Sequence, residues 1–251
     1  MTILNISTTG SIRTLELNRP DKRNALNDEL IAALKTALRE ADADETLRAM
    51  VIRGAGNDFC SGADLASIQK IANATYEENV DDARSLAELF QLIRSVRFPV
   101  IAAIHGRALA GGCGLATACD LVIATRSARF GYPEVKIGFV PAMVAAILRR
   151  NLGEKKSFEL LTQGFEFSSE EANAIGLVNA LFEDEGFDVA AIDYASRYEK
   201  VSASAVAMTK QLLNDIDGLS FPDAVAKGVE TNAKARMTDD CKKGIARFLD
   251  R

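Results

Sequence analysis

Hydrophobic positions repeat along this chain with two periods, one typical of strands and one typical of helices. Between residues 28 and 41, Leu30, Leu34 and Leu38 share one helical face, so an amphipathic helix is expected there. Because strand and helix patterns alternate through the first two thirds of the chain, we predict an α/β core with parallel strands. Strands are expected at residues 3–6, 12–17, 49–53, 100–104, 121–124 and 177–182.

A long helix is expected over residues 77–96, ending before Pro99, because proline disfavours helix at the residue that precedes it. After Pro141 the chain becomes almost wholly helical in pattern. We therefore divide the chain into a core over residues 1–185 and a helical C-terminal region over residues 186–251, which we expect to serve oligomerisation. Further helices are expected at residues 143–151, 154–162, 169–175, 188–197, 203–215, 221–235 and 239–249.

Composition excludes several classes of function. The 251 residues carry a net charge of −5, which makes nucleic acid or an anionic membrane a poor first choice of partner. No apolar run approaches the roughly 18 residues of a membrane span, and the first ten residues lack the pattern of a secretory leader. The four cysteines are scattered, as expected of reduced thiols in a cytoplasmic protein.

Common catalytic groups are also scarce. The chain has one histidine, His105, and no G-x-S-x-G turn, which argues against a Ser-His-Asp hydrolase. Nitrogen and sulfur ligands do not cluster at short spacing, so no metal site is expected. The glycine-rich segments match neither a complete dinucleotide fingerprint nor a phosphate loop, so no separate cofactor is expected either. The acids Glu77, Glu78, Asp81 and Asp82 are interpreted as the solvated start of a helix.

Two glycine-marked turns carry the candidate chemistry. One runs over Cys60–Asp64 and the other over Ala110–Cys113, and each follows an expected strand and opens an expected helix. If the two strands are parallel in one sheet, both helix N-termini lie at the same edge, where ligands bind in such folds. Two backbone N–H groups could then meet one oxygen atom and stabilise negative charge on it, with Glu134 as a nearby proton carrier.

Four stretches of the chain resemble the crotonase, or enoyl-CoA hydratase/isomerase, superfamily. The likeness extends in the expected order over essentially the whole chain, including Glu170–Asn179 and Ala246–Arg251. The stretches are LNRPDKRNALN (Leu17–Asn27), FCSGADL (Phe59–Leu65), PVIAAIHGRALAGGCGLATACDLVIAT (Pro99–Thr125) and FGYPEVKIGFVP (Phe130–Pro141).

This resemblance implies a fold, an assembly and a set of roles. The fold is a spiral of repeated β-β-α units with a helical C-terminal region, assembled as a trimer or a dimer of trimers. The backbone N–H groups of Ala63 and Gly111 would hold the carbonyl oxygen of an acyl-CoA thioester, and Glu134 would be the catalytic acid and base. Substrate-binding positions by the same resemblance are Lys22, Arg23, Ala25, Ala63, Asp64, Leu65, Gly111 and, toward the CoA of an adjacent subunit, Phe248.

One departure from the family pattern leaves the reaction open. Typical hydratases of the family carry a second glutamate where this chain has Gly114, and a glycine cannot transfer a proton. Syn hydration of a 2-enoyl-CoA by Glu134 alone is favoured slightly, because the stretch EVKIGFVPA resembles a branch of enoyl-CoA and methylglutaconyl-CoA hydratases. The alternatives are a Δ3-Δ2-enoyl-CoA isomerase, which needs one base, and a CoA-thioester binding protein with little catalysis.

Overall fold

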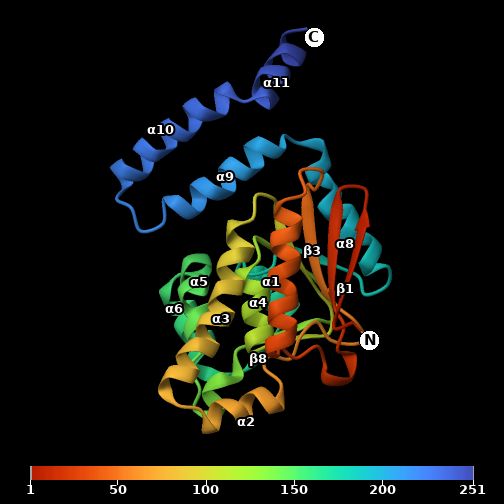
Figure 1. The fold of residues 1–251 in the computed structure, drawn as a ribbon, viewed down its shortest axis with the longest axis vertical. Coiled ribbons are helices and arrows are strands. Elements are labelled where there is room, and N and C mark those ends of the chain that lie inside the picture. The colour runs from red at the N-terminus through yellow and green to blue at the C-terminus, as the bar shows by residue number, and fades with distance from the viewer. Residues whose placement is uncertain (1, 251) are drawn as a thin grey trace.

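A mainly parallel sheet runs through the centre of the computed structural model, which describes residues 2–250 apart from the side chain of Leu65 (Figure 1). The strand order is β1-β2-β3-β4-β6-β9; β1 pairs antiparallel with β2, and each later pair of neighbours is parallel. The strands are β1 (Leu4–Thr9), β2 (Ile12–Leu17), β3 (Ala49–Gly54), β4 (Val100–Ile104), β6 (Leu121–Thr125) and β9 (Ala180–Phe182).

A second, smaller sheet lies beside the first and was not foreseen from the sequence. It consists of β5 (Arg107–Leu109), β7 (Arg129–Gly131) and β8 (Glu166–Ser168) in the order β5-β7-β8. Each strand has three residues, which is too short for an alternating pattern to show. With these strands in place, β4–β5–α4 and β6–β7–α5 repeat the same strand-strand-helix order, so the α/β class and the spiral of β-β-α units are confirmed.

The expected helices form within about two residues of their predicted ends. Thr75 and Glu78 form a capping box that begins α3, and α3 ends just ahead of Pro99. None of the helices in residues 2–250 is long and apolar enough to cross a membrane. The helices are α1 (Asp28–Asp42), α2 (Leu65–Asn73), α3 (Tyr76–Ser95), α4 (Gly111–Ala118), α5 (Ala142–Leu152), α6 (Glu154–Gln163), α7 (Ser169–Ala174), α8 (Phe187–Ser196), α9 (Ala203–Asp215), α10 (Phe221–Met237) and α11 (Asp239–Leu249), with short 3-10 turns η1 (Pro20–Lys22), η2 (Pro133–Ile137) and η3 (Arg197–Lys200).

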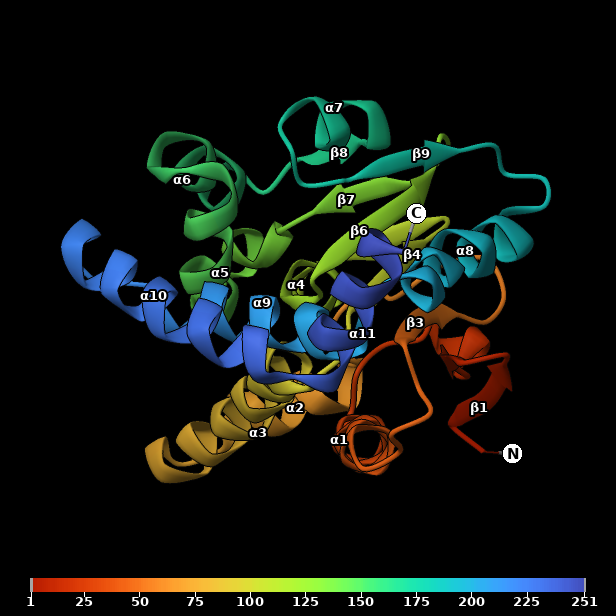
Figure 2. The ribbon, with the colours of Figure 1, turned by 90° about the horizontal axis from the view of Figure 1, so that it is seen from above.

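The sheet separates two hydrophobic cores. Successive side chains of a strand point to opposite faces, and in β3 this sends Met50 and Ile52 into the larger core and Val51 into the smaller one. Figure 2 shows α1 and α3 on the side of the larger core, and α8 on the other side of the sheet. Phe187 and Ala191 of α8 complete the smaller core.

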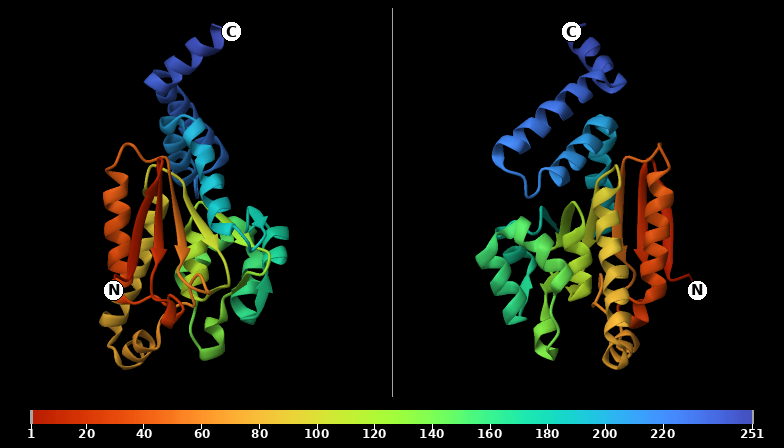
Figure 3. Two further views of the ribbon diagram at one scale, coloured as in Figure 1. Left: turned by 90° about the vertical axis from the view of Figure 1, so that its right-hand side faces the viewer. Right: turned by 60° about the vertical axis from the view of Figure 1, so that its left-hand side comes forward.

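The last three helices stand apart from this body. In both views of Figure 3, α10 and α11 project beyond the sheet, and α2 lies at the opposite end of the molecule in Figure 1. Both α10 and α11 pack on α9 and on each other. Because α8 packs on the sheet, the first helix to extend away from the core is α9. The domain boundary near residue 185 stays a prediction.

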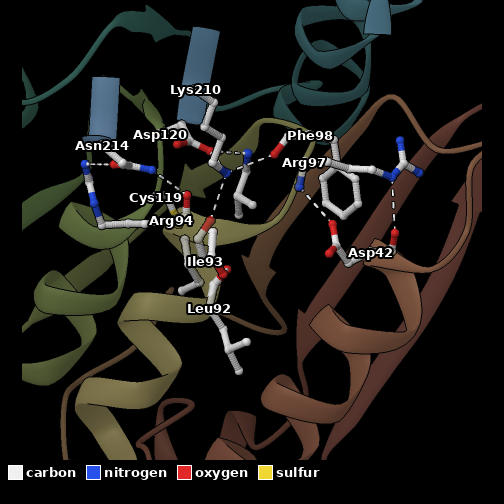
Figure 4. A network of polar contacts seen from close by, with 12 residues as sticks. Asp42, Leu92, Ile93, Arg94, Arg97, Phe98, Cys119, Asp120, Lys210 and Asn214 are labelled. Carbon is white, nitrogen blue, oxygen red and sulfur yellow. Dashed lines mark hydrogen bonds and ion pairs between the residues drawn. The ribbon is translucent and has the colours of Figure 1, made fainter. Parts of the chain in front are cut away.

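One buried cation joins α9 to the body (Figure 4). The Lys210 ammonium donates to the carbonyl oxygens of Ile93 at 2.9 Å and Phe98 at 3.0 Å, and to the Asp120 carboxylate at 2.6 Å. Its side chain is only 9% exposed. Burial raises the pKa of Asp120 and lowers that of Lys210, and the ion pair opposes both shifts. A pair of hydrogen bonds between Asn214 and Arg94 supports the same contact.

Replacing Lys210 by methionine should destabilise the protein by about 1–3 kcal/mol, because it leaves the Ile93 and Phe98 carbonyl groups without this donor and removes the ammonium from the Asp120 carboxylate. Urea unfolding measures the change. Arg84→Met is the matched control: Arg84 pairs with Asp81 at 3.1 Å on the surface, where both side chains are at least 75% exposed. The control should change the free energy of unfolding by less than about 1 kcal/mol. Equal effects of the two substitutions would contradict the importance of the buried pair.

Candidate active site

The two glycine-marked turns lie side by side. Cys60 and Ala108 form a parallel bridge, in which the Cys60 N–H donates to the Arg107 carbonyl at 3.1 Å and the Leu109 N–H donates to the Cys60 carbonyl at 3.0 Å. Gly62 has a φ of +99°, and a Cβ atom there would lie 2.8 Å from the Cβ of Ala110. Only glycine satisfies both the backbone angle and the contact. The close packing of the turns therefore depends on this residue.

Both expected donors are free to bind a ligand. The groups on either side of Ala63 are used by Leu26, because the Leu26 N–H donates to the Gly62 carbonyl and the Asp64 N–H to the Leu26 carbonyl. The Ala63 N–H consequently faces away from Leu26. Gly111 is the first residue of α4, so its N–H has no acceptor within the helix. Within residues 2–250, neither N–H donates to a backbone carbonyl.

A strained backbone orients the second donor. Ala110, the residue before α4, has a φ of 50° and a ψ of −128°, in a region that non-glycine residues rarely occupy. Such a conformation costs on the order of 1–3 kcal/mol and persists where the surrounding structure enforces it, often at ligand sites. Here the Ala110 N–H donates to the Gly131 carbonyl at 2.9 Å, which ties the strained residue to β7.

Glu134 is carried by η2, directly after β7. Its neighbour Tyr132 is fully buried and bonds to Thr117 of α4 at 2.7 Å between the two hydroxyl oxygens, which anchors the start of the turn. The Glu134 side chain is half-buried, and its Oε2 atom is buried without a partner in the part of the chain that the structure describes. Burial raises the pKa of this carboxyl above 4.5. A raised pKa favours a carboxyl group that both takes up and releases a proton.

One cavity of about 620 Å³ contains both donors and the carboxylate. Ala63, Gly111 and Glu134 all line it, so the structure brings together the three residues that the sequence proposed as catalytic. Its remaining wall is largely apolar, which excludes water and strengthens electrostatic interactions inside. The apolar wall includes Leu26, Ile31, Ile68, Ile71, Leu86, Phe90, Phe139, Val140, Met143 and Val144.

Gly114 is closed off by an aromatic ring. A Cβ atom at this position would lie 3.2 Å from the Cζ of Phe90 and 3.7 Å from the Cβ of Val144. The resemblance predicts a second glutamate at position 114. This position is adjacent to the space that Phe90 occupies. The absence of a carboxylate at position 114 and the packing of Phe90 against that position are therefore two features of the same part of the cavity wall.

The remaining expected binding residues lie outside the wall of this cavity. Lys22 and Arg23 are exposed on and just after η1, and the Arg23 carbonyl accepts from Ser61 at 3.0 Å, so this turn adjoins the Ala63 turn. Ala25 is buried. Phe248 is 76% exposed on α11.

Asp64 and Leu65 stand at the start of α2. Asp64 caps this helix by accepting from the Ser67 N–H at 2.9 Å, and its carboxylate pairs with Arg19 at 2.8 Å. Leu65 opens α2, and its side chain lies outside the described residues. A structural role for Asp64 is therefore evident, whereas its role in binding CoA stays a prediction.

Sequence reasoning missed part of the cavity wall on α3. The four acids at the start of this helix were interpreted as solvated, which is correct for Glu77, Glu78 and Asp81 but wrong for Asp82. Asp82 is half-buried and lines the cavity together with Asn79. The helical spacing of Asn79, Leu86 and Phe90 was the available signal, since it places the three on one face.

Comparison with known proteins agrees with this geometry. The family model for enoyl-CoA hydratase/isomerase matches residues 7–251. A Thermus thermophilus protein named as an enoyl-CoA hydratase is 39% identical over 242 residues, 96% of either chain. The 2,3-dehydroadipyl-CoA hydratase of Escherichia coli is 31% identical and covers 100% of this chain and 97% of its own.

The chain belongs to the enoyl-CoA hydratase/isomerase family. The crystal structure of an enoyl-CoA hydratase from Mycobacterium smegmatis matches its fold with a TM-score of 0.94 at 32% identity, covering 100% of this chain and 97% of the other. Membership of the crotonase superfamily, expected from four sequence stretches, is thereby confirmed.

Placing a glutamate at position 114 of this family member should require room at Phe90. Gly114→Glu alone is expected to lower the free energy of unfolding by about 1–3 kcal/mol, because the new side chain meets the Phe90 ring. Combined with Phe90→Ala, it should cost less than the sum of the two single substitutions. Urea unfolding of the four proteins measures the coupling. Additive effects would contradict a contact between the new side chain and Phe90. Gly114→Ala, which adds only the Cβ, should cost least.

Proposed function

We propose that this protein hydrates 2-enoyl-CoA thioesters by syn addition of water, with Glu134 as its single catalytic carboxylate. The observation that carries the proposal is one apolar cavity holding a partly buried glutamate and two free backbone N–H groups. The reaction needs that combination, because negative charge develops on the thioester oxygen while protons move at carbon. The only CoA involved is part of the substrate.

The two N–H groups of Ala63 and Gly111 supply the electrostatic part. A thioester oxygen bound between them becomes more negative as a nucleophile adds at Cβ, and fixed donors stabilise that charge without reorganising. Removing one such donor in other enzymes typically costs about 3 kcal/mol of transition-state stabilisation. Because these donors are backbone groups, side-chain substitution at either position leaves them present, and their placement depends on the turn packing at Gly62.

Glu134 supplies the proton transfer. Its carboxylate removes one proton from water as the water oxygen bonds to Cβ, and the enolate forms on the thioester oxygen. The protonated Glu134 then returns that proton to Cα, so a single residue completes the addition on one face. Its raised pKa and its unpaired Oε2 support this double use.

Two other assignments follow from different observations. The absence of a carboxylate at Gly114 favours Δ3-Δ2-enoyl-CoA isomerisation, in which Glu134 would carry a proton from C2 to C4. A CoA-thioester binding protein with little catalysis would need the same cavity, but it would not need an ionisable group of raised pKa within it. The methylglutaconyl-like substrate suggested by the sequence remains a finer prediction within the hydratase assignment.

Offering the purified protein a 2-enoyl-CoA and a 3-enoyl-CoA distinguishes these reactions. Loss of the conjugated thioester absorbance from the 2-enoyl substrate is the expected result, and Glu134→Gln should reduce the rate at least about a hundredfold. The acid limb of the kcat/KM profile should lie above pH 4.5, because burial raises the Glu134 pKa and the free enzyme needs the carboxylate form.

Each other outcome selects another assignment. Conjugation of the 3-enoyl substrate without hydration of the 2-enoyl one would mark an isomerase. Tight binding without turnover of either would mark a binding protein. Full activity of Glu134→Gln on both would contradict the role of this residue, and Glu166→Gln, on the exposed part of β8, serves as the control.

We also propose that the projecting helices pair this chain with further copies of itself, as a trimer or dimer of trimers. Phe221, Val225 and Val229 follow one another at four-residue spacing on α10, and each is exposed, with Phe221 at 82%. Monomeric proteins seldom expose an apolar stripe of this kind. The CoA contact expected of Phe248 belongs to the same assembly, since Phe248 lies on the adjoining α11.

Replacing Val225 and Val229 together by glutamate should shift the protein from the oligomer to the monomer, because charges in an apolar interface carry a large desolvation cost. Light scattering after size-exclusion chromatography measures the mass. Glu230→Gln, an exposed neighbour on the same helix, should leave the mass unchanged. A wild-type protein that is already monomeric at assay concentrations would overturn this part of the proposal.

A further inference from the structure

The wall of the cavity formed by α3 changes from apolar to polar along the helix. Phe90 lies at one end, where it contacts the position of Gly114 in the helix that begins with Gly111. Leu86 lies one turn closer to the N-terminus of α3, and Asp82 and Asn79 lie further in the same direction. All three line the same cavity. At a rise of about 1.5 Å per residue, Asp82 lies about 12 Å and Asn79 about 16 Å along the helix from Phe90.

The polar end offers hydrogen-bond acceptors that lack a donor. The Oδ1 atom of Asn79 is buried and has no partner in residues 2–250, while its Nδ2 donates weakly to the Ala74 carbonyl at 3.4 Å. Asp82 is half-buried beside it, and no hydrogen bond to its carboxylate is formed within the described residues. Both residues line the cavity and have an acceptor oxygen that receives no hydrogen bond within residues 2–250, so a ligand that donates to either binds better than one that does not.

The charges around this end are mostly negative. Asp28 of α1 lines the cavity, and burial together with Asp28 raises the Asp82 pKa. The neighbouring cation, Lys70 of α2, is engaged by Asp28 at 2.7 Å and only partly offsets the effect. Lys136 of η2 also lines the cavity, but its Cγ and Cε atoms lie against Gly164, at the end of α6.

We propose that Asp82 and Asn79 select acyl groups whose far end carries a hydrogen-bond donor, such as a hydroxyl group, over a plain hydrocarbon end, and disfavour a terminal carboxylate. This inference rests on the proposed function, because it takes the cavity as the site of the acyl chain. With the thioester oxygen at Ala63 and Gly111, a chain that follows α3 past Phe90 and Leu86 ends beside the two acceptors. A carboxylate there would face Asp82 and Asp28 and supply no donor.

A matched set of 2-enoyl-CoA thioesters tests the selection directly. The set differs only in the terminal group, which is methyl, hydroxymethyl, aminomethyl or carboxyl, and is made at several chain lengths; kcat/KM is measured for each. Among chains long enough to reach Asp82, we expect the donor-bearing ends to exceed the methyl end by about tenfold or more, as a hydrogen bond to a charged or buried acceptor allows. The carboxyl end should be the poorest of the four.

Substitutions then assign the preference to the two residues. Asp82→Leu and Asn79→Leu should each reduce the ratio of hydroxymethyl to methyl substrate toward one, and Asp82→Asn should relieve the penalty on the carboxyl end. The matched control is Asp81→Leu: Asp81 is next in sequence but exposed, and pairs with Arg84 outside the cavity. The control should leave the ratio as it is in the wild type. Ratios within one protein do not depend on how much of a variant folds.

The outcomes separate this inference from the proposed function. Equal turnover of all four ends by the wild type, or a preference for the carboxyl or methyl end, would overturn the inference while leaving the hydratase assignment intact. Failure to turn over any member of the set would overturn the hydratase assignment itself. If the preference for donor-bearing ends is unchanged in both Asp82→Leu and Asn79→Leu, residues other than these two recognise the end of the acyl chain. A preference for the aminomethyl over the hydroxymethyl end would still support the inference and would mean that Asp82 is charged in the complex.

Discussion

The parallel contact between the Cys60–Ala63 and Arg107–Gly111 segments is the constraint on which the rest of the site depends. Neither segment belongs to the main sheet, yet their hydrogen bonds align two helix starts that come from distant parts of the chain. The contact is so close that residue 62 must lack a side chain. In the proposed reaction, negative charge would therefore be stabilised by backbone position alone, and the fold rather than any titratable donor would decide where it develops.

The proposed proton-transfer group, Glu134, obeys a different constraint. Glu134 follows a strand of only three residues, and its pKa depends on an apolar surrounding rather than on a charged partner. A second carboxylate at position 114 would have changed that surrounding, since one negative group raises the pKa of its neighbour. With Phe90 lying against position 114 instead, the proposed catalytic groups are one acid and two N–H donors.

The sequence was a good guide wherever a residue type has few structural uses. Glycines at 62 and 112 mark tight backbone approaches, and an isolated acid such as Glu134 stands out against its neighbours. The small sheet escaped notice because three residues are too few to show a period. Asp82 escaped because a helix start rich in acids is usually solvated, and only the rotation of α3 about its axis decides which acid faces inward. The role of Phe248 depends on a second molecule.

Helix α3 takes part in two tasks that are separated along its length. Its last turn, with Ile93 and Arg94, receives the Lys210 ammonium and Asn214 from α9 and so belongs to the joint between body and projecting helices. Its first turns form the cavity wall at the other end. Leu86 and Phe90 continue the cavity wall along the helix between these two ends. If α3 selects the acyl group as proposed, side chains in the first half of this helix could be exchanged without disturbing the contacts by which α9 is held, and acyl specificity would be a separable trait of the fold.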